Sequence, residues 1–352
     1  MSLYSNDNYL EDIRAVADLP LPWEILKGKS IMISGATGLI GSFLIDVLIE
    51  KNINDALGCT IYALGRSKDK AETRFDKYFE NLKFINYDVK LPLDMDDLGT
   101  INYILHLASN THPVQYSTDP IGTITTNIIG LQNMLEFACA HNTTRFAFAS
   151  SNEIYGENRG DTEFFDESYF GYINCNTLRA GYPESKRCGE ALCQAYKSQK
   201  GLDVVIPRFT RTYGPTMLMT DTKAISQFIK KGVSGEDIVL KSAGTQLYSY
   251  QYVADSVSGL LTVLLCGESG EAYNIAEEHS DMMLKDLAAT IADINGKEVV
   301  FEIPDAVEAA GYSTATKARL DGHKLQAIGW EPKYNIRTGL VRTISILKAL
   351  RR

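Results

Sequence analysis

The sequence lacks several features that would indicate other classes of protein. No apolar run among its 352 residues approaches the roughly 20 residues that a membrane-spanning helix needs. Residues 1–10 are mostly polar, so we expect neither a membrane anchor nor a secretory signal, and we predict a cytoplasmic protein. The net charge is −9, and the sequence contains no basic stripe. Both observations argue against a nucleic-acid partner, because nucleic-acid phosphates need a basic surface.

Cysteine and histidine are also few. The 6 cysteines and 5 histidines are scattered, without a Cys-x-x-Cys pair or histidines at metal-ligand spacing. We therefore predict no metal site, and free thiols in a reducing compartment. The remaining composition, 45% hydrophobic and 22% charged, is typical of a globular chain with one large or two ordinary domains.

A glycine-rich stretch follows the first predicted strand. Residues 30–34 are apolar and partly β-branched, and an apolar-periodic helix runs on to Lys51. Between them, glycines allow a tight turn, a close approach of backbone to a pyrophosphate, and close packing of the helix on the strand. The helix N-terminus would then face the phosphates. The pattern predicts a dinucleotide site made of Gly35, Thr37, Gly38, Leu39, Ile40 and Gly41.

Strands alternate with helices up to Arg208. The apolar patterns predict strands over 60–64, 84–87, 103–107, 146–150 and 203–208, and helices over 68–79 and 121–141. Such alternation predicts an α/β fold with a doubly wound parallel Rossmann sheet, whose ligands lie beyond the carboxyl ends of the strands. Candidate residues at those ends are Ser34, Arg66, Asp88, Ala108 and Ser151.

The chain divides into three parts by pattern. Residues 1–28 form a polar N-terminal extension with a short helix near 9–17, and residues 29–206 form the predicted dinucleotide-binding domain. Over residues 207–352 the alternation loosens, with helices expected at 223–231 and 253–266 and a strand at 238–240. We predict a smaller mixed α/β substrate lobe there, with segments returning to the Rossmann domain, and a substrate cleft between the lobes.

Tyr182 and Lys186 lie four residues apart on one face of a predicted helix. A phenol with a pKa of about 10 is a poor base at neutral pH, and a neighbouring ammonium that lowers this pKa would make it a usable one. By themselves the two residues are more typical of a solvated helix face. The surrounding motifs decide in favour of a proton-transfer role.

Four motifs together resemble a known family. They are the glycine turn at 35–41, Ser-Ser-Asn-Glu-Ile-Tyr-Gly at 150–156, Tyr-x-x-x-Lys at 182–186, and Arg-Phe-Thr-Arg-Thr-Tyr-Gly-Pro at 208–215. In this order they resemble the extended short-chain dehydrogenase/reductases, the NAD-dependent epimerase/dehydratase family that acts on nucleotide sugars. The resemblance covers residues 29–350. The segments 105–109, 126–130, 169–174 and 213–217 are most similar to the UDP-glucuronate decarboxylase subgroup.

The resemblance implies a role for each matching residue. Tyr182 would exchange a proton with a sugar hydroxyl while Lys186 lowers its pKa and binds the nicotinamide ribose. Ser151 would hydrogen-bond the reacting oxygen, and Glu153 would be a third acid/base group. The implied cofactor contacts beyond the glycine turn and Arg66 are Asp88 and Val89 at the adenine, Leu107, Ala108 and Ser109, and Asn127, Ser150 and Phe209. The implied substrate contacts are Asn152, Arg179, Arg211, Lys223 and Tyr248.

This sequence departs from the family at four positions. Asn152 replaces the aspartic acid of the 4,6-dehydratases and cannot donate a catalytic proton as that acid does. Tyr248 replaces an arginine of the decarboxylases, while Arg211 replaces a substrate-binding asparagine and would supply a displaced phosphate contact. Arg66 follows the second strand where an acidic residue would hold a free ribose 2′-hydroxyl. Arg66 is compatible with a solvated loop, but we favour pairing with a 2′-phosphate, and hence NADP(H) over NAD.

These departures favour an oxidoreductase that moves a hydride at one carbon of a nucleotide-linked sugar. The alternatives are a UDP-glucuronate decarboxylase, 4-epimerase or 4,6-dehydratase that recycles bound NAD, and a non-catalytic cofactor-binding paralogue. The resemblance also implies a homodimer through the helices at 121–141 and from Pro183. Three further residues have structural readings: we expect His106 and Tyr155 in the core, and Asn127 either on a solvated helix face or in a buried organising position.

Overall fold

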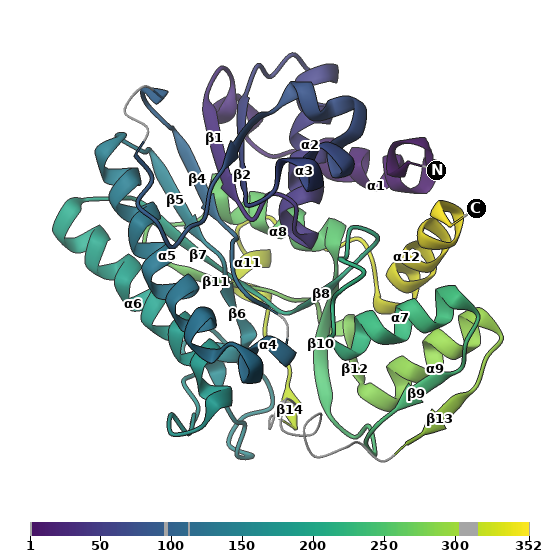
Figure 1. Cartoon of the computed structure of the whole chain (residues 1–352). Coiled ribbons are helices and arrows are strands. Elements are labelled where there is room, and N and C mark those ends of the chain that lie inside the picture. The colour runs from purple at the N-terminus through teal and green to yellow at the C-terminus, as the bar shows by residue number, and fades with distance from the viewer. Residues whose placement is uncertain (1, 95–97, 112, 303–315, 352) are drawn as a thin grey trace.

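The central sheet is parallel throughout, as predicted. The computed structural model describes residues 2–94, 98–111, 113–302 and 316–351. Its main sheet has the order β11-β7-β5-β4-β1-β2-β3, with β6 paired to β7 (Figure 1). The strands are β1 Ser30–Ser34, β2 Thr60–Gly65, β3 Lys83–Asn86, β4 Tyr103–His106, β5 Arg145–Phe148, β6 Ser150–Ser151, β7 Val204–Phe209 and β11 Ala272–Ile275.

Alternate strand residues enter two separate apolar cores. Ile31 and Ile33 pack with helices α2 (Leu39–Asn54) and α8 (Val253–Cys266). Met32 and Ile104 pack on the opposite face with α5 (Pro120–Ala140) and α6 (Gly181–Lys200). Helices on both faces of a parallel sheet define a doubly wound Rossmann fold, so the predicted fold class is confirmed.

A second lobe lies beside this sheet, and we use that name for the elements of its two small sheets and their helices. In one sheet β10 (Leu247–Tyr252) pairs parallel with β8 (Arg211–Tyr213) and β14 (Lys317–Ala318), and antiparallel with β12 (Asp281–Met283). The other sheet pairs β9 (Ile238–Leu240) with β13 (Val299–Phe301). Helices α7 (Ala224–Ser234) and α9 (Leu284–Asn295) pack against each other beside it. After β7 the chain enters this lobe and returns to the main sheet through α8 and β11.

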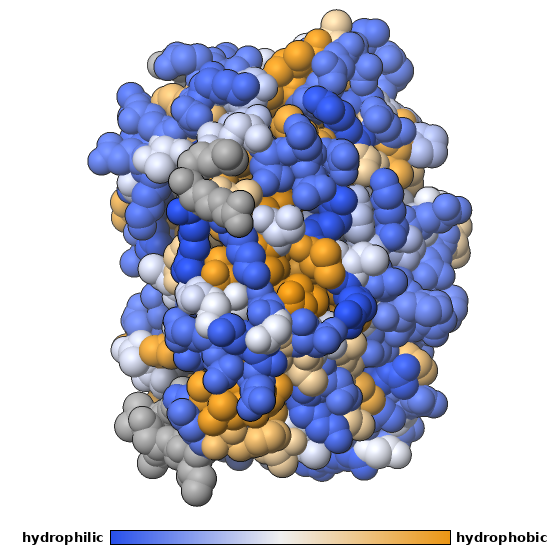
Figure 2. Space-filling view, turned by 90° about the vertical axis from the view of Figure 1, so that its right-hand side faces the viewer, coloured by the Kyte–Doolittle hydropathy of each residue, from blue (hydrophilic) through white to orange (hydrophobic). Residues whose placement is uncertain are grey.

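The N-terminal residues pack against helices from early, middle and late parts of the chain. Helix α1 (Asp7–Ala17), between the 3-10 turns η1 (Leu3–Ser5) and η2 (Trp23–Leu26), lies against α2, α8 and the last helix, α12 (Ile336–Leu350). Figure 1 shows both ends of the chain on the same side of the molecule. Figure 2 faces that side and shows a largely hydrophilic surface with apolar residues gathered near its middle.

The helix predicted over 68–79 is interrupted. Helix α3 (Lys68–Phe75) ends where Asp76 adopts a φ of 47°, and a 3-10 segment, η3 (Asp76–Asn81), continues. A positive φ removes Asp76 from the right-handed helical region, so the apolar pattern alone overestimated the helix. The remaining short elements are α4 Pro113–Thr118, η5 Asn152–Tyr155, η6 Leu178–Ala180, η7 Glu278–Ser280 and α11 His323–Gln326.

Three further properties concern the described part of the chain. No helix there is both long and apolar enough to cross a membrane. All six cysteines are free thiols. Within the same residues, no group of three or more His, Cys, Asp or Glu side chains is arranged to hold a metal ion.

Candidate active site

The carboxyl ends of the central strands open into a cavity of about 950 Å³ that residues of the second lobe complete. Every residue predicted as a catalytic, cofactor or substrate contact lines this cavity, except Asn127. The topology explains the convergence, because parallel strands present their carboxyl ends along one edge of the sheet. Residues scattered from Gly35 to Tyr248 in the sequence therefore meet in one place.

The glycine turn after β1 is tightly enclosed by backbone. Gly35 has a φ of +74°, and a Cβ atom there would lie 2.9 Å from the backbone nitrogen of Ala108. A Cβ at Gly41 would lie 2.4 Å from the carbonyl oxygen of Gly35. Helix α2 begins directly after Gly38, its N-cap residue. This closely packed turn at a helix N-terminus fits the pyrophosphate of a dinucleotide, and residues Gly35 to Gly41 would hold it.

The loops after β2 and β3 form the far end of the cavity. Arg66 is exposed and lines it, as do Asp88 and Val89. Val89 is fixed from α5, because its carbonyl oxygen accepts a hydrogen bond from the Asn133 amide at 2.8 Å. A Cβ at Gly130 would lie only 2.8 Å from Val89 Cγ2, so helix and loop meet closely here. This end suits the adenosine half of a dinucleotide bound at the glycine turn.

Asn127 lies behind the cavity and is buried. Its Oδ1 accepts a hydrogen bond from Ser109 Oγ at 2.7 Å, and its Nδ2 donates to Ser185 Oγ at 2.8 Å. Of the two predicted roles, the structure therefore supports the buried organising one: Asn127 orients Ser109, which itself lines the cavity. Ser150 lines the cavity too, but its hydroxyl donates to Glu190 Oε1 at 2.5 Å.

Tyr182 and Lys186 are both buried near the start of α6. The Lys186 ammonium donates to the carbonyl oxygen of Ala149 at 2.7 Å and lies 5.9 Å from the centre of the Tyr182 ring. Burial lowers the pKa of Lys186 to about 8. The pKa of Tyr182 is raised by burial and by the charge of Glu153, against smaller opposing effects that include a hydrogen bond with Ser151. In the protein by itself desolvation dominates, and the lowering of this pKa by Lys186 stays a prediction.

Glu153 is held by Arg179 through two contacts of 2.8 Å, one to each carboxylate oxygen. Burial raises the pKa of Glu153, but Arg179, Arg211 and Lys223 outweigh it, and the net effect lowers the pKa. The carboxylate is therefore ionised at neutral pH with both oxygens engaged. A base so stabilised is weak unless a ligand displaces Arg179.

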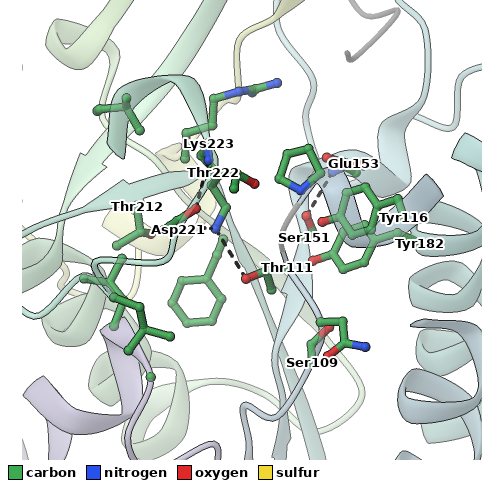
Figure 3. A pocket seen from close by; sticks show the side chains of 18 of the residues that line it. Ser109, Thr111, Tyr116, Ser151, Glu153, Tyr182, Thr212, Asp221, Thr222 and Lys223 are labelled. Carbon is green, nitrogen blue, oxygen red and sulfur yellow. Dashed lines mark hydrogen bonds and ion pairs between the residues drawn. The ribbon is translucent and has the colours of Figure 1, made fainter. Parts of the chain in front are cut away.

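Tyr116 is a cavity residue that the sequence reasoning missed. Its ring stacks on Tyr182 with a centroid separation of 4.8 Å and an interplanar angle of 23°, and the Arg179 guanidinium lies 4.7 Å from its ring centre. Figure 3 shows the two tyrosine rings side by side, next to Ser151 and Glu153. Helix α4, which carries Tyr116, is short and was not predicted. The available signal was a tyrosine in the loop after a strand that ends at the site.

A bridge from the second lobe faces these residues. The Lys223 ammonium donates to Asp221 Oδ2 at 3.2 Å and to Thr111 Oγ1 at 3.3 Å, as the dashed lines in Figure 3 show. Thr111 follows β4 in the main sheet, whereas Asp221 and Lys223 precede α7 in the second lobe. The hydroxyl of Thr216 also donates to the carbonyl oxygen of Leu39 at 2.8 Å. The two lobes are thus joined directly across the cavity.

His106 and Tyr155 belong to the core, as predicted. The His106 ring is buried alongside Phe146 and Phe148, and burial lowers its pKa to about 3. Its Nδ1 lies 2.9 Å from Ser34 Oγ. The Tyr155 hydroxyl donates to Asn274 Oδ1 at 2.6 Å. Neither residue lines the cavity.

The cavity is basic although the chain is acidic. Among the described residues, its lining contains seven basic side chains and three acidic ones, against a net charge of −9 for the chain. The basic residues are Arg66, Arg179, Lys186, Arg211, Lys223, Lys231 and Lys241, and the acidic ones are Asp88, Glu153 and Asp221. Such a charge distribution suits a ligand with several negative charges.

Residues 31–276 match the model of the NAD dependent epimerase/dehydratase family. The chain belongs to this family. It is 34% identical over 316 residues to UDP-glucuronic acid decarboxylase 5 of Arabidopsis thaliana, covering 88% of this chain and 86% of the relative. UDP-glucuronic acid decarboxylase 1 of Xenopus tropicalis is 33% identical over 317 residues, covering 90% of this chain and 71% of the relative. The family resemblance read from the motifs is therefore confirmed.

Solved structures of the family share the fold of this member. A dTDP-glucose 4,6-dehydratase of Streptomyces venezuelae, with NAD bound, superposes with a TM-score of 0.78 at 23% identity and covers 92% of this chain and 98% of its own. The UDP-glucuronic acid 4-epimerase of Bacillus cereus, in complex with UDP-glucuronic acid and NAD, gives 0.76 at 22% identity and covers 91% and 99%. The family member described here thus has the family fold along nearly its whole length.

Proposed function

We propose that this family member transfers a hydride at one ring or chain carbon of a nucleotide-linked sugar, with Tyr182 as the acid/base group. One observation carries the proposal: Tyr182 and Ser151 lie together in the cavity that begins at the glycine turn. The basic lining supports a substrate with a diphosphate.

The chain's own residues supply the proton transfer and the binding. Gly35 to Gly41 would hold a nicotinamide dinucleotide, which would accept or donate the hydride. Tyr182 exchanges the proton of the reacting oxygen, and Ser151 hydrogen-bonds the same oxygen. The phenol of Tyr182, whose pKa burial raises, is protonated at neutral pH. In the reductive direction a ketone oxygen would receive this proton.

The first candidate reaction is reduction of a nucleotide-linked ketose with NADPH. Arg66 supports this choice, since it lines the cofactor end of the cavity and can pair with a 2′-phosphate. The purified protein should release little dinucleotide on denaturation and should bind NADPH more tightly than NADH. Arg66→Ala should remove that preference. Tightly retained NAD would instead point to an enzyme that recycles its cofactor.

The second candidate is decarboxylation of UDP-glucuronate, the reaction named for the relatives that are 33–34% identical. It is favoured by Glu153 and Arg179, a paired carboxylate and guanidinium close to Tyr182. Release of CO₂ from UDP-glucuronate with bound NAD, without net consumption of a dinucleotide, would establish it. Turnover with any nucleotide sugar would exclude a non-catalytic paralogue.

We also propose a homodimer and a cytoplasmic location. On α5, Ile121 and Ile129 are 76% and 44% exposed, and α6 lies beside this helix. Exposed isoleucines on a long helix suit a second copy of the same surface. Light scattering should give twice the chain mass, and Ile129→Glu should reduce it. Six free cysteines suit a reducing compartment.

A further inference from the structure

One wall of the cavity carries buried polar atoms without hydrogen-bond partners among the described residues. They are Arg211 Nη1, the Tyr250 hydroxyl and Gln246 Oε1. All three residues line the cavity. Buried polar groups are nearly always paired, so several unpaired ones on residues that line a cavity indicate a ligand that supplies the missing partners.

Strand pairing brings these residues together. Arg211 in β8 is the register partner of Tyr250 in β10. Residues 246, 248 and 250 alternate along one face of β10 and the residue preceding it, and all three line the cavity. The wall is thus part of a sheet rather than a loose loop, which fixes the spacing of its side chains.

Tyr248 fixes the orientation of the guanidinium. The Arg211 guanidinium carbon lies 3.5 Å from the centre of the Tyr248 ring, and Tyr248 is buried. A guanidinium stacked on an aromatic face keeps its N–H donors in the plane of the group, directed away from the ring. No carboxylate among the described residues lies within salt-bridge distance of Arg211. Its charge and at least one donor are therefore available to a ligand.

We infer that Arg211, oriented by Tyr248, and the hydroxyl of Tyr250 form an oxyanion site for the substrate on the β8–β10 wall. The inference rests on the proposed function, because it names how the nucleotide-linked substrate is held. Two sources of the oxyanion share this chemistry: the diphosphate of the nucleotide, or a carboxylate on the sugar. The charge of Arg211 acts on Glu153, which lines the same cavity as Tyr182.

The test is calorimetric binding of UDP, UDP-glucose and UDP-glucuronate to the cofactor-loaded protein. A lost charge-assisted hydrogen bond should weaken binding about 10- to 100-fold in Arg211→Gln, and by a smaller factor in Tyr250→Phe. Arg211→Lys keeps the charge but not the fork of donors. Its affinity for the ligands should lie between those of Arg211→Gln and the unsubstituted protein. Arg337→Gln removes an equal charge at an exposed position of α12 and should bind like the unsubstituted protein.

The pattern of losses identifies the oxyanion. Equal weakening for all three ligands would support the site and assign it to the diphosphate, whereas weakening for UDP-glucuronate alone would support it and assign it to a carboxylate. Unchanged binding of all three ligands by folded Arg211→Gln and Arg211→Lys would overturn the inference and leave the proposed function intact. Failure of the unsubstituted protein to bind any of them would overturn the inference, whereas the proposed function fails only if no nucleotide sugar is turned over.

Discussion

At Tyr182, burial competes with the nearby charges. The phenol lies beneath the Tyr116 ring and close to the ionised Glu153, and both surroundings disfavour a phenolate. The Lys186 ammonium lies 5.9 Å from the centre of the Tyr182 ring and is directed at the carbonyl oxygen of Ala149. At neutral pH, Tyr182 is therefore neutral and the neighbouring carboxylate of Glu153 is ionised.

Removing the Tyr182 hydroxyl should separate chemistry from binding. In Tyr182→Phe the ring and its stacking on Tyr116 remain, so cofactor affinity should stay within a factor of about two. Turnover should fall by about 10²- to 10⁴-fold, the usual contribution of a general acid/base. Stopped-flow measurement of nicotinamide absorbance with a nucleotide sugar checks this, with Tyr78→Phe, outside the cavity, as the control. A fully active Phe variant would remove Tyr182 from the mechanism.

The buried ammonium of Lys186 should make stability depend on pH in a defined window. Its pKa falls from 10.5 to about 8 on folding, so between these values the unfolded chain binds the extra proton. The free energy of unfolding should then rise with pH across pH 8–10.5, and below pH 8 the cost of this burial is on the order of 3 kcal/mol.

Lys186→Met tests this cost directly. The variant should be more stable than the natural sequence at pH 7, and its advantage should shrink as the pH approaches 10.5. Urea unfolding at several pH values measures the difference, with Lys200→Met, exposed at the end of α6, as the control for loss of charge. An advantage that stays constant with pH would contradict a lowered lysine pKa.

At the scale of elements, the backbone around the turn between β1 and α2 decides which residue the turn can contain. Gly35 needs both a positive φ and space beside Ala108, and only glycine satisfies both. Gly28 has a similar φ of +65°, but no atom lies within 4 Å of a Cβ placed there. Comparing Gly35 with Gly28 therefore separates the effect of the left-handed conformation from the effect of close contact.

Gly35→Ala should therefore be more harmful than Gly28→Ala. Both substitutions cost roughly 1–2 kcal/mol for the left-handed conformation, and Gly35→Ala adds a clash with the turn after β4. Dinucleotide affinity should fall at least tenfold in Gly35→Ala and remain unchanged in Gly28→Ala. Fluorescence titration and thermal unfolding measure the two effects. Equal losses in both variants would mean that the close approach has no part in binding.

Elements with a regular apolar pattern were predictable, and those stabilised by polar contacts were not. The strand at 30–34, the strand at 238–240 and the helix at 253–266 lie where the pattern indicates. β10 was missed because Ser249 and Gln251 are buried along with its tyrosines, so the strand shows no alternation of polar and apolar residues. The Ser249 hydroxyl donates to Asp281 Oδ1 at 2.5 Å, a partner far away in the sequence.

At the scale of the whole molecule, α1 connects the Rossmann sheet with the second lobe. The hydroxyls of Tyr4 and Tyr9 donate to Asp46 in α2. On the other side, buried Asp12 accepts hydrogen bonds from Tyr252 of β10 at 2.6 Å and Tyr334 at 2.7 Å. Thus the helix that starts at the glycine turn and the strand that carries the proposed oxyanion site are both attached to one N-terminal segment.

Asp12→Ala should loosen this connection. It leaves two phenols and the Arg342 guanidinium, 2.7 Å from Asp12 Oδ1, without their acceptor. We expect a loss of about 3–5 kcal/mol in the free energy of unfolding, as for other broken buried ion pairs. Urea titration checks this. Glu11→Ala, which removes the exposed partner of Arg342, is the control, and an equal small effect of both variants would contradict the role of Asp12.

The sequence by itself determined the parts of this protein that depend on neighbouring residues. The glycine turn, the four-residue spacing of Tyr182 and Lys186, and the alternation of strands and helices are local patterns. They led to the family, the sheet and a set of site residues of which all but Asn127 line the cavity. The tertiary structure alone decided which groups from distant segments meet. It stacked Tyr116 on Tyr182, buried Asn127 between two serines, laid Arg211 on Tyr248, and raised the pKa of Tyr182. These properties follow from desolvation and from contacts between segments far apart in the chain, for which no local pattern exists.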